Sequence, residues 1–296
     1  MRQNHMLPNP LDPLLDRLER LIDRVEPLLP GPDREPDWSA AIAWRWLKGE
    51  GLTPVRHPHR LQLRDLLAID RQRSELERNT RQFVEGRPAN NALLWGSRGT
   101  GKSSLVKALL NAYSDRGLRL IEVDKAGLED LPRIADQVWD RPERFILFCD
   151  DLSFSEQEAG YQTLKALLDG SVAATPDNVL IYATSNRRHL LPEHHGENRQ
   201  ATYVDGELHL GDAIEEKVSL SERFGLWLSF YPFKQDEYLT IVHHWLATWG
   251  IDSKDDAELN QEALRYALSR GSRSGRVAMQ FAKDWAGRQS VGWDEA

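Results

Sequence analysis

The chain has 296 residues, of which 40% are hydrophobic and 28% charged, and its formal net charge is −8. This length suits one large domain or two modest ones, and the negative charge argues against a broad electrostatic contact with nucleic acid, while leaving room for a local basic patch. No apolar stretch approaches the length of a membrane span, and MRQNHMLPNP lacks the apolar core of a signal peptide.

The cysteine count bears on the compartment. Cys149 is the only cysteine, which excludes an intramolecular disulfide. A chain without disulfides suits a reducing cytosol, so we expect a cytoplasmic protein without a membrane partner.

Two helices are predicted in the N-terminal part. Residues 11–29 place their leucines, an isoleucine and a valine on one helical stripe, with charged residues on the opposite face. After the Pro- and Gly-rich break LPGPDREPD, residues 37–51 predict a second helix that Asp37 or Ser39 would begin and Gly49 would end. We therefore expect a helical N-terminal extension over residues 1–62, which either packs on the main body or offers a surface to a partner.

From residue 63 the pattern changes to an alternation of helices and strands. Short apolar runs predict strands at 92–95, 119–123, 144–149, 179–184 and 226–230. Helical patterns occur at 66–85, 102–113, 127–139, 155–169 and 212–222. This alternation predicts an α/β nucleotide-binding domain over residues 63–232, with a parallel sheet covered by helices.

The strands stop after Pro232. Three helical patterns follow, at 235–250, 260–270 and 274–287. They predict a small all-helical domain over residues 233–296 that docks on its neighbour.

A glycine loop lies between the first of these strands and the helix at 102–113. GSRGTGKS matches G-x-x-x-x-G-K-[ST] without a mismatch, a pattern whose backbone N–H groups and helix N-terminus contact phosphate oxygens. Lys102 is expected to reach the β- and γ-phosphates, and Ser103 to ligate Mg²⁺. The predicted ATP-binding residues are Gly96, Ser97, Arg98, Gly99, Thr100, Gly101, Lys102, Ser103 and Ser104.

Two acids follow the buried strand RFILFC. Adjacent carboxylates at the end of such a strand cost desolvation energy unless a cation or donors satisfy them. We interpret Asp150 as a metal-side residue and Asp151 as the group that polarises the attacking water. A strand that simply reaches solvent is the alternative. The next strand ends at Asn186, whose amide could hold the same water or contact the γ-phosphate.

Two arginines complete the set of candidate catalytic residues, which also includes Asp151 and Asn186. Arg223 lies in SERFG before the last strand, where it could reach a neighbour's γ-phosphate; a solvated or salt-bridged arginine is the alternative. Arg276 opens the last helix and could reach phosphate from the helical domain. Arg273 is a competing candidate, and a basic turn is the alternative.

In this order the parts resemble an AAA+ ATPase. GSRGTGKS resembles Walker A, FILFCDD Walker B, ATSN sensor 1, ERFG the arginine-finger segment and SGR sensor 2. Residues 68–96 resemble the segment that packs near the adenine in that superfamily. The phrases LLWGSRGTGKSS and YATSNRRHL make the chain most similar to a group of bacterial AAA+ proteins of unassigned function, and the resemblance covers about residues 66–290.

The resemblance implies a P-loop fold with five parallel strands in the order 5-1-4-3-2, a helical lid, and ATP and Mg²⁺ as cofactors. It implies a homo-oligomer with a shared active site, in which Arg223 acts on a neighbouring protomer. Asp151 departs from the superfamily, which usually has Glu here, and its side chain is shorter by about one bond of ~1.5 Å. Hydrolysis could therefore be slow, use a water bridge, or recruit another acid such as Glu156.

The sequence thus predicts an ATPase that couples Mg-ATP binding and hydrolysis to remodelling of an unknown client. The alternative is a nucleotide-gated binding module with little or no turnover, which Asp151 keeps open. A GTPase is disfavoured because no Asn-Lys-x-Asp run follows a strand, and a kinase would not need the terminal helical domain.

Two further segments bear on the client. Asp-Gly in ATYVDGELHL predicts a hairpin at 201–210, which could contact a client or be a surface decoration. Arg187, Arg188 and His189 form a small basic spot that does not by itself establish nucleic-acid binding.

Overall fold

The computed structural model describes most of the chain from residue 36 to residue 291, with gaps. The described residues are 17, 20, 36–154, 158–169, 176–187, 190, 202–204, 207–209, 220–253 and 256–291. Almost all of the predicted helix over 11–29, most of the one over 212–222, and the candidates Glu156, Arg188 and His189 lie outside them.

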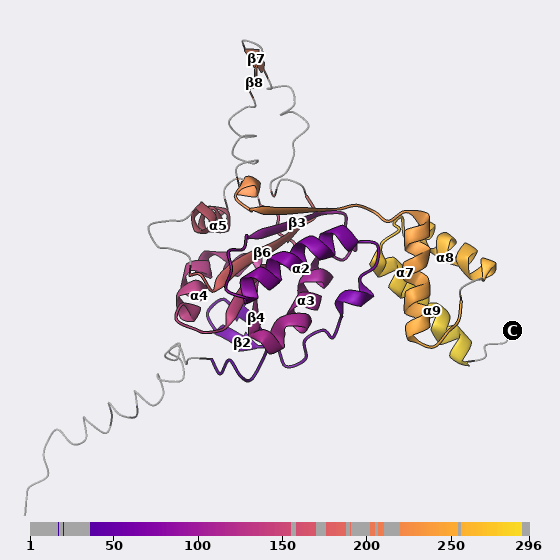
Figure 1. The fold of residues 1–296 in the computed structure, drawn as a ribbon, viewed down its shortest axis with the longest axis horizontal. Coiled ribbons are helices and arrows are strands. Elements are labelled where there is room, and N and C mark those ends of the chain that lie inside the picture. The colour runs from indigo at the N-terminus through magenta and orange to yellow at the C-terminus, as the bar shows by residue number, and fades with distance from the viewer. Residues whose placement is uncertain are drawn as a thin grey trace, which may run out of the picture.

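A mixed sheet forms the centre of the molecule (Figure 1). The described strands in this sheet are β1 (Ala43–Leu47), β2 (Gly51–Pro54), β3 (Ala92–Gly96), β4 (Leu118–Val123), β5 (Arg144–Cys149), β6 (Val179–Ser185) and β9 (Leu226–Phe230). Across the sheet their order is β2-β1-β4-β5-β6-β3-β9. Only the β1–β2 pair is antiparallel among these seven described strands. The five predicted strands therefore lie in the order β9-β3-β6-β5-β4, and two more strands extend the sheet at β4.

Strand β1 shows that the predicted helix over 37–51 is wrong. Trp44 lies between Ile121 of β4, in parallel pairing, and Pro54 of β2, in antiparallel pairing. The run AIAWRWL is apolar enough for either structure, but tryptophan packs well on a pleated sheet. Gly49 and Gly51 have φ angles of 88° and 84°, so this glycine pair turns the chain into a hairpin instead of ending a helix. The sheet consequently has more than five strands, and residues 37–62 are not a helical extension.

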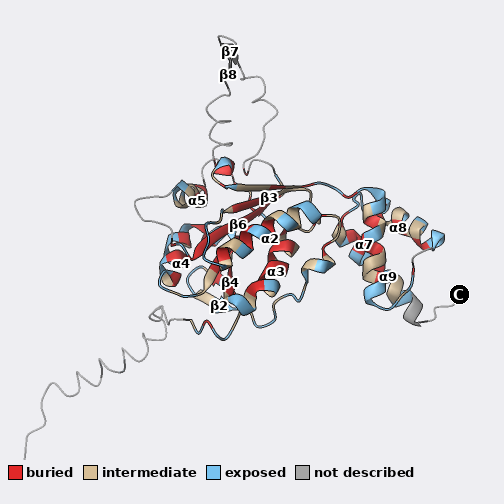
Figure 2. Ribbon diagram, viewed as in Figure 1, coloured by how far each residue is buried: buried red, intermediate tan, exposed pale blue. Residues whose placement is uncertain are grey.

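Helices cover both faces of the sheet (Figures 1 and 2). Helices α2 (Asp70–Val84) and α3 (Lys102–Tyr113) pack on one face, and α4 (Leu131–Val138) and α5 (Ala159–Asp169) pack on the other. Short 3₁₀ turns connect these elements, at η2 (Leu63–Asp65), η3 (Ser114–Arg116) and η4 (Lys125–Asp130). The chain thus forms a three-layer α/β arrangement.

Hydrophobic cores lie on both sides of the sheet because successive side chains of a strand point to opposite faces. In β5, Ile146 and Phe148 belong to the core under α2 and α3, whereas Phe145, Leu147 and Cys149 belong to the core under α4 and α5. All five side chains are fully buried. Burial raises the pKa of Cys149 to about 12, so its thiol stays protonated and packs as a small apolar group.

The C-terminal part of the described chain is helical. Helices α7 (Gln235–Thr248), α8 (Ala257–Ser269) and α9 (Gly275–Val291) follow β9, and their buried side chains join the core of α2 and α3. Strands β7 (Thr202–Val204) and β8 (Glu207–His209) pair in antiparallel register, which confirms the predicted hairpin. Within the part of the chain that the structure describes, we find no helix with the length and apolar character needed to cross a membrane.

Candidate functional site

The glycine loop joins β3 to α3 at the carboxyl end of the parallel strands (Figure 1). The backbone N–H of Ser97 donates to the carbonyl oxygen of Phe230 at 2.9 Å, which ties the loop to the end of β9. The Thr100 hydroxyl donates to the carbonyl oxygen of Ser97 at 2.7 Å. These bonds fix the loop from the side of the sheet and from within.

Two positions in the loop require glycine. Gly96 has a φ of 127°, and a Cβ there would lie 2.0 Å from the carbonyl oxygen of Phe230. Gly99 has a φ of 73°, and a Cβ there would lie 2.8 Å from the Ser274 hydroxyl. The chain can therefore follow this path past β9 and α9 only without a side chain at either position.

Lys102 is a buried cation, with 7% of its surface exposed. Its ammonium group donates to the carbonyl oxygens of Gly96 at 2.8 Å and Ser97 at 2.7 Å, and to the Asn186 Oδ1 atom at 3.1 Å. All three acceptors are neutral, and Lys102 forms no ion pair with a described residue. Burial lowers the pKa of Lys102 to about 8. A buried ammonium group without a paired anion fits a phosphate ligand at this loop.

Asp150 accepts two hydrogen bonds on one carboxylate oxygen. The Ser103 hydroxyl donates to Oδ1 at 2.6 Å, and the Thr184 hydroxyl donates to the same oxygen at 2.5 Å. Carboxylate and hydroxyl oxygens are ligands that suit Mg²⁺, which keeps several waters and takes few protein ligands. No group of three or more His, Cys, Asp or Glu side chains comes together as a metal site among the described residues. Ser103 and Asp150 therefore fit a magnesium ion that also contacts phosphate.

Asp151 has a backbone in the left-handed region, with a φ of 52°. Its N–H donates to the Thr184 hydroxyl at 2.8 Å, and its carboxylate accepts a hydrogen bond from the Asn186 amide. Asn186 thus bonds to Lys102 through its oxygen and to Asp151 through its nitrogen. The structure thus brings together five of the predicted site residues through their side chains: Lys102, Ser103, Asp150, Asp151 and Asn186.

The first turn of α9 contacts the glycine loop directly. The N–H groups of Gly275 and Arg276 donate to the carbonyl oxygen of Gly99, at 2.9 and 3.4 Å. The Cβ atom of Arg276 lies 3.4 Å from the place that a Cβ on Gly99 would take. Arg273 instead uses its carbonyl oxygen to accept from the N–H of Phe233. Of the two candidates in this turn, Arg276 is the one at the loop.

Arg223 lies away from this cluster. It precedes β9, whose opposite end pairs Phe230 with Gly96, and the five residues of the strand span about 3.3 Å each. Its guanidinium forms an ion pair with Asp169 at the end of α5. Arg223 is thus salt-bridged within the chain. It lies near the amino-terminal end of β9, whereas the glycine loop lies at the carboxyl-terminal end of that strand.

The structure adds site residues that the sequence did not single out. Thr184 bonds to both acids, the Phe230 carbonyl holds the start of the loop, and Ser274 packs on Gly99. Thr184 stands within the ATSN run, which was the available signal. Ser104 is half-buried in the first turn of α3, and Arg98 is exposed at the tip of the loop.

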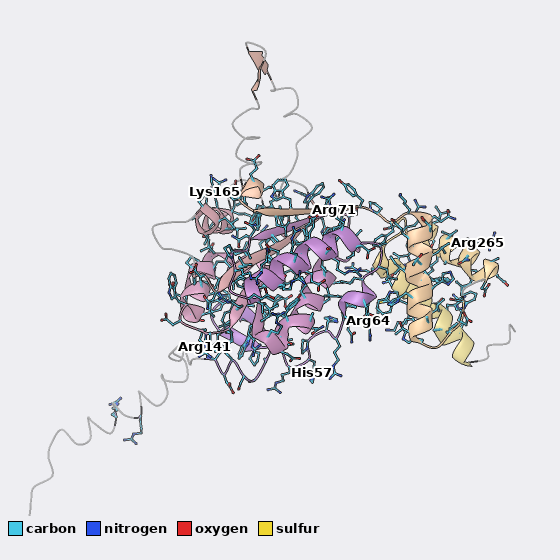
Figure 3. The ribbon with its side chains drawn as sticks, viewed as in Figure 1. His57, Arg64, Arg71, Arg141, Lys165 and Arg265 are labelled. Atoms are coloured by element: carbon cyan, nitrogen blue, oxygen red, sulfur yellow. The ribbon has the colours of Figure 1, made fainter. Side chains whose placement is uncertain are left out.

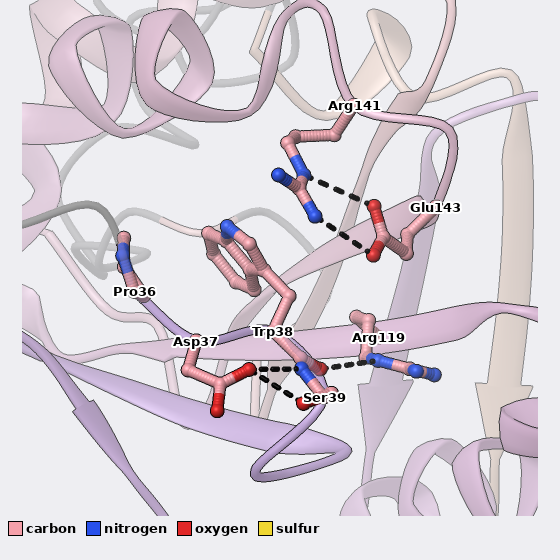
Figure 4. Close-up of a pocket in the computed structure, with 7 residues that line it drawn as sticks. All are labelled: Pro36, Asp37, Trp38, Ser39, Arg119, Arg141 and Glu143. Atoms are coloured by element: carbon pink, nitrogen blue, oxygen red, sulfur yellow. Dashed lines mark hydrogen bonds and ion pairs between the residues drawn. The ribbon is translucent and has the colours of Figure 1, made fainter.

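A cavity of about 360 Å³ lies elsewhere, near the amino ends of β4 and β5 (Figure 4). It is lined by Pro36, Asp37, Trp38, Ser39, Arg119, Arg141 and Glu143. Arg141 donates to both carboxylate oxygens of Glu143, at 3.2 and 3.1 Å, and Asp37 accepts from Ser39. Arg119 donates to backbone carbonyl oxygens, among them that of Trp38. Because the cavity lies at the amino ends of these strands and the glycine loop at the carboxyl ends, it is not the phosphate site.

Comparison with known proteins agrees with this architecture. The model of a family described as "Protein of unknown function (DUF815)" matches residues 39–289, and no curated protein matches the chain. The RuvB Holliday junction branch migration motor of Thermotoga maritima is 16% identical, with a TM-score of 0.54, over 78% of this chain and 66% of that one. The Aeropyrum pernix ORC1 protein in complex with DNA is 16% identical, with a TM-score of 0.51, over 77% and 62%. The chain thus spans less than two thirds of the length of these structures, and at this identity the likeness shows the fold alone.

Proposed function

The chain belongs to the family described as "Protein of unknown function (DUF815)" and has the fold of AAA+ P-loop ATPases, and on this basis we propose that it binds and hydrolyses Mg-ATP to remodel a client. The observation that carries this proposal is the buried ammonium group of Lys102, held by neutral acceptors in a glycine loop beside the Ser103–Asp150 pair. An anion with a divalent cation complements both features at once.

In this proposal the loop residues 96–104 bind the phosphates, and an apolar border receives the base. Ile69 Cδ1 lies 3.5 Å from the place that a Cβ on Gly101 would take, and Leu66 Cδ2 lies 4.0 Å from it. Both side chains are buried. Ile69 belongs to the segment 68–96 that is expected near the adenine, and Leu66 shortly precedes it, which supports that expectation.

The remaining candidates divide the catalytic work. Ser103 and Asp150 hold Mg²⁺, which when bound neutralises charge on the phosphate oxygens. Asp151 accepts a proton from the attacking water, and Asn186 orients that water through its amide. Arg276 contacts phosphate from α9, so that a change at the loop moves the helices at residues 233–296, which we propose as a lid on a nucleotide-binding domain ending at residue 232.

We further propose that the active site is shared between copies of this chain. Arg223 is too far along β9 to reach its own loop, so it serves a neighbour's γ-phosphate if it leaves Asp169. A homo-oligomer follows from this assignment. The buried, protonated Cys149 and the absence of other cysteines suit the cytosol as its compartment.

The charge of the chain bears on the nature of the client. RuvB is named as a Holliday junction motor and ORC1 is seen in complex with DNA, but this chain carries a net charge of −8. The cations labelled in Figure 3 lie on separate parts of the described molecule and do not form one basic surface: Arg64, Arg71, Arg141, Lys165 and Arg265. The net charge of the chain therefore gives no support to nucleic acid as the client.

One observation favours a second function, a nucleotide-gated binding module with little turnover. The Asp151 carboxylate, already shorter than the usual Glu, is bonded to the Asn186 amide. A carboxylate held in this way is less available to a water molecule. In that case ATP would act as a switch for docking of a partner.

The test is Mg-ATP turnover per protomer across a wide range of protein concentration, together with ATP affinity of Lys102→Ala. We expect the rate per protomer to rise with concentration, and ATP binding to be lost in the variant. Intact ATP binding in Lys102→Ala contradicts the site. A low rate that does not change with concentration, with tight ATP binding, favours the switch.

A further inference from the structure

Thr184 is a buried residue whose hydroxyl joins the two acids at the end of β5. It is 1% exposed, in strand β6, which lies between β5 and β3. An ionised carboxylate can only accept, so the hydroxyl must donate its proton to Asp150 and accept the N–H of Asp151. A single oxygen atom therefore orients the side chain of one acid and the backbone of the other.

Thr184 also holds the chain that follows the acids. The N–H of Leu152 donates to the Thr184 carbonyl oxygen at 2.7 Å. The backbone N–H groups of Asp151 and Leu152 are therefore both bound to one residue of β6. Asp151 has a φ of 52°, a conformation that costs energy for a residue with a Cβ and persists only when its surroundings impose it. Thr184 supplies that restraint.

The geometry leaves one oxygen of Asp150 open. Ser103 and Thr184 both bind Oδ1, and Oδ2 accepts no hydrogen bond from a described residue. With Oδ1 fixed by two hydroxyl donors, the carboxylate cannot rotate freely, and Oδ2 keeps a fixed direction. An oxygen held in this manner is suited to a metal ion or to a water of its shell.

The hydrogen bonds of Thr184 belong to a continuous network that runs through the site. Ser103 bonds to Asp150, Asp150 to Thr184, and Thr184 to the N–H of Asp151. The Asp151 carboxylate bonds to Asn186, and Asn186 to Lys102, which is the chain neighbour of Ser103. Removal of the Thr184 hydroxyl therefore breaks the hydrogen-bonded connection between Asp150, which is proposed to hold the metal, and Asp151, which is proposed to act on the water.

We infer that Thr184 is a positioning residue that couples Asp150, on the metal side, to Asp151, on the water side. This inference rests on the proposed Mg-ATP site. It assigns Thr184 no contact with the reacting atoms; the residue acts through the two acids. Its loss therefore weakens the metal-dependent part of nucleotide binding and the rate of turnover, and leaves metal-independent binding by the glycine loop intact.

The experiment compares Thr184→Val, which keeps the branched shape and loses the hydroxyl, with Thr184→Ser, which keeps the hydroxyl. ADP affinity is measured by calorimetry in Mg²⁺ and in EDTA, Mn²⁺ binding to the ADP complex by electron paramagnetic resonance, and kcat and KM by turnover. In Thr184→Val we expect a loss of about tenfold in Mn²⁺ affinity and in the Mg²⁺-dependent gain of ADP affinity, as one charge-assisted hydrogen bond is removed. We expect kcat to fall more than KM changes, and Thr184→Ser to recover most of both losses.

The matched control is Thr80→Val. Thr80 is also fully buried, and its hydroxyl bonds to the Leu76 carbonyl oxygen at 2.8 Å and to the Tyr182 hydroxyl at 2.9 Å, away from the acids. It carries the same substitution and a similar loss of buried hydrogen bonds. We expect it to lower stability without changing Mn²⁺ affinity or the EDTA difference.

Three outcomes overturn the inference: a Thr184→Val protein with unchanged metal dependence, a Thr184→Ser protein as impaired as the valine variant, or an equal metal defect in Thr80→Val. If valine prevents folding, Thr184→Ala supplies the same comparison with serine. A wild-type protein that binds ADP equally with and without Mg²⁺ overturns the proposed metal site and the inference with it. A wild type with the Mg²⁺ effect and a Thr184→Val variant that retains it overturns the inference alone.

Discussion

The backbone N–H of Gly275 donates to the carbonyl oxygen of Gly99 at 2.9 Å. This bond and the one from the Arg276 N–H join the first turn of α9 to the glycine loop, so the C-terminal helices contact the proposed phosphate site directly. The helices also share a hydrophobic core with α2 and α3. A movement of the loop on binding a nucleotide must therefore either break these bonds or carry α9 with it.

The contact predicts a specific effect of Gly99→Ala. A Cβ at Gly99 would lie 2.8 Å from the Ser274 hydroxyl and 3.0 Å from its Cβ, so the Ser274 side chain or the start of α9 has to shift away from the loop. We expect at least about a tenfold loss of ATP affinity and a loss of about 2 kcal/mol in the free energy of unfolding. Calorimetry with ATP and urea unfolding measure the two quantities.

Gly117→Ala is the matched control for backbone strain. Gly117 has a φ of 90°, and a Cβ there meets nothing within 4 Å. This variant should lose about 1 kcal/mol of stability, the cost of a side chain in the left-handed region, and keep its ATP affinity. Equal ATP affinities in the two variants would show that the contact between loop and α9 has no part in binding.

Lys102 predicts how the stability of the ligand-free protein depends on pH. Burial lowers the pKa of Lys102 from 10.5 to about 8. As the pH rises, the ammonium group of Lys102 therefore loses its proton at a lower pH in the folded protein than in the unfolded chain. Between about pH 8 and 10.5 the unfolded state binds more protons, and the free energy of unfolding rises with pH.

The measurement is urea unfolding of the wild type and of Lys102→Met at several pH values between about 7.5 and 10.5. This range covers the interval between the two pKa values of Lys102. Relative to Lys102→Met, the wild type should gain on the order of 3 kcal/mol across this window, because each unit of pKa corresponds to about 1.4 kcal/mol. Parallel curves for the two proteins would mean that Lys102 titrates normally and is not buried as a charge.

Asp151→Asn separates ATP binding from turnover. Asparagine tolerates a positive φ, and its side-chain oxygen can still accept the hydrogen bond from Asn186. We therefore expect stability within about 1 kcal/mol of the wild type and unchanged ATP affinity. Turnover should fall by about 10²–10⁴-fold, the usual effect of losing a general base.

The control for Asp151→Asn is Asp115→Asn, a change of the same charge at an exposed position in η3. It should leave turnover as it is. Wild-type turnover in Asp151→Asn would instead mean that another group activates the water, and would remove Asp151 from the proposed catalytic set.

A shared active site predicts that two inactive variants restore each other. Lys102→Ala lacks the loop lysine but keeps Arg223, and Arg223→Ala has the opposite defect. In an oligomer mixed at random from equal amounts, about a quarter of the interfaces combine an intact lysine with an intact arginine. We expect each variant alone to be inactive and the mixture to recover turnover in about that proportion.

The mixing experiment has a built-in control, since a mixture of Lys102→Ala with Lys102→Met has no intact lysine and must stay inactive. Failure of the first mixture to recover, with both variants folded and assembled, would place Arg223 outside the active site. Its ion pair with Asp169 would then indicate a structural role.

Several elements could be predicted from local sequence because their patterns are short-range. The helix from Lys102 to Tyr113 and the strands 144–149 and 226–230 have the predicted limits, since a glycine precedes the first and acids or turn residues bound the strands. The prediction for β1, the first strand, was wrong. The apolar run around its two tryptophans suits a helix or a strand, and the pairing of β1 with β4, which lies far along the chain, decided between the two structures.

The sequence by itself determined the fold class, the glycine loop, the two acids after β5 and the amide after β6, because each is a residue type at a fixed place relative to a local strand or helix. Tertiary structure alone decided which of these side chains bond to one another. It placed the Thr184 hydroxyl between Asp150 and Asp151, set α9 on Gly99, and paired Arg223 with Asp169. Such contacts join residues distant in the chain, so their geometry depends on how the sheet and helices pack and has no local pattern in the sequence.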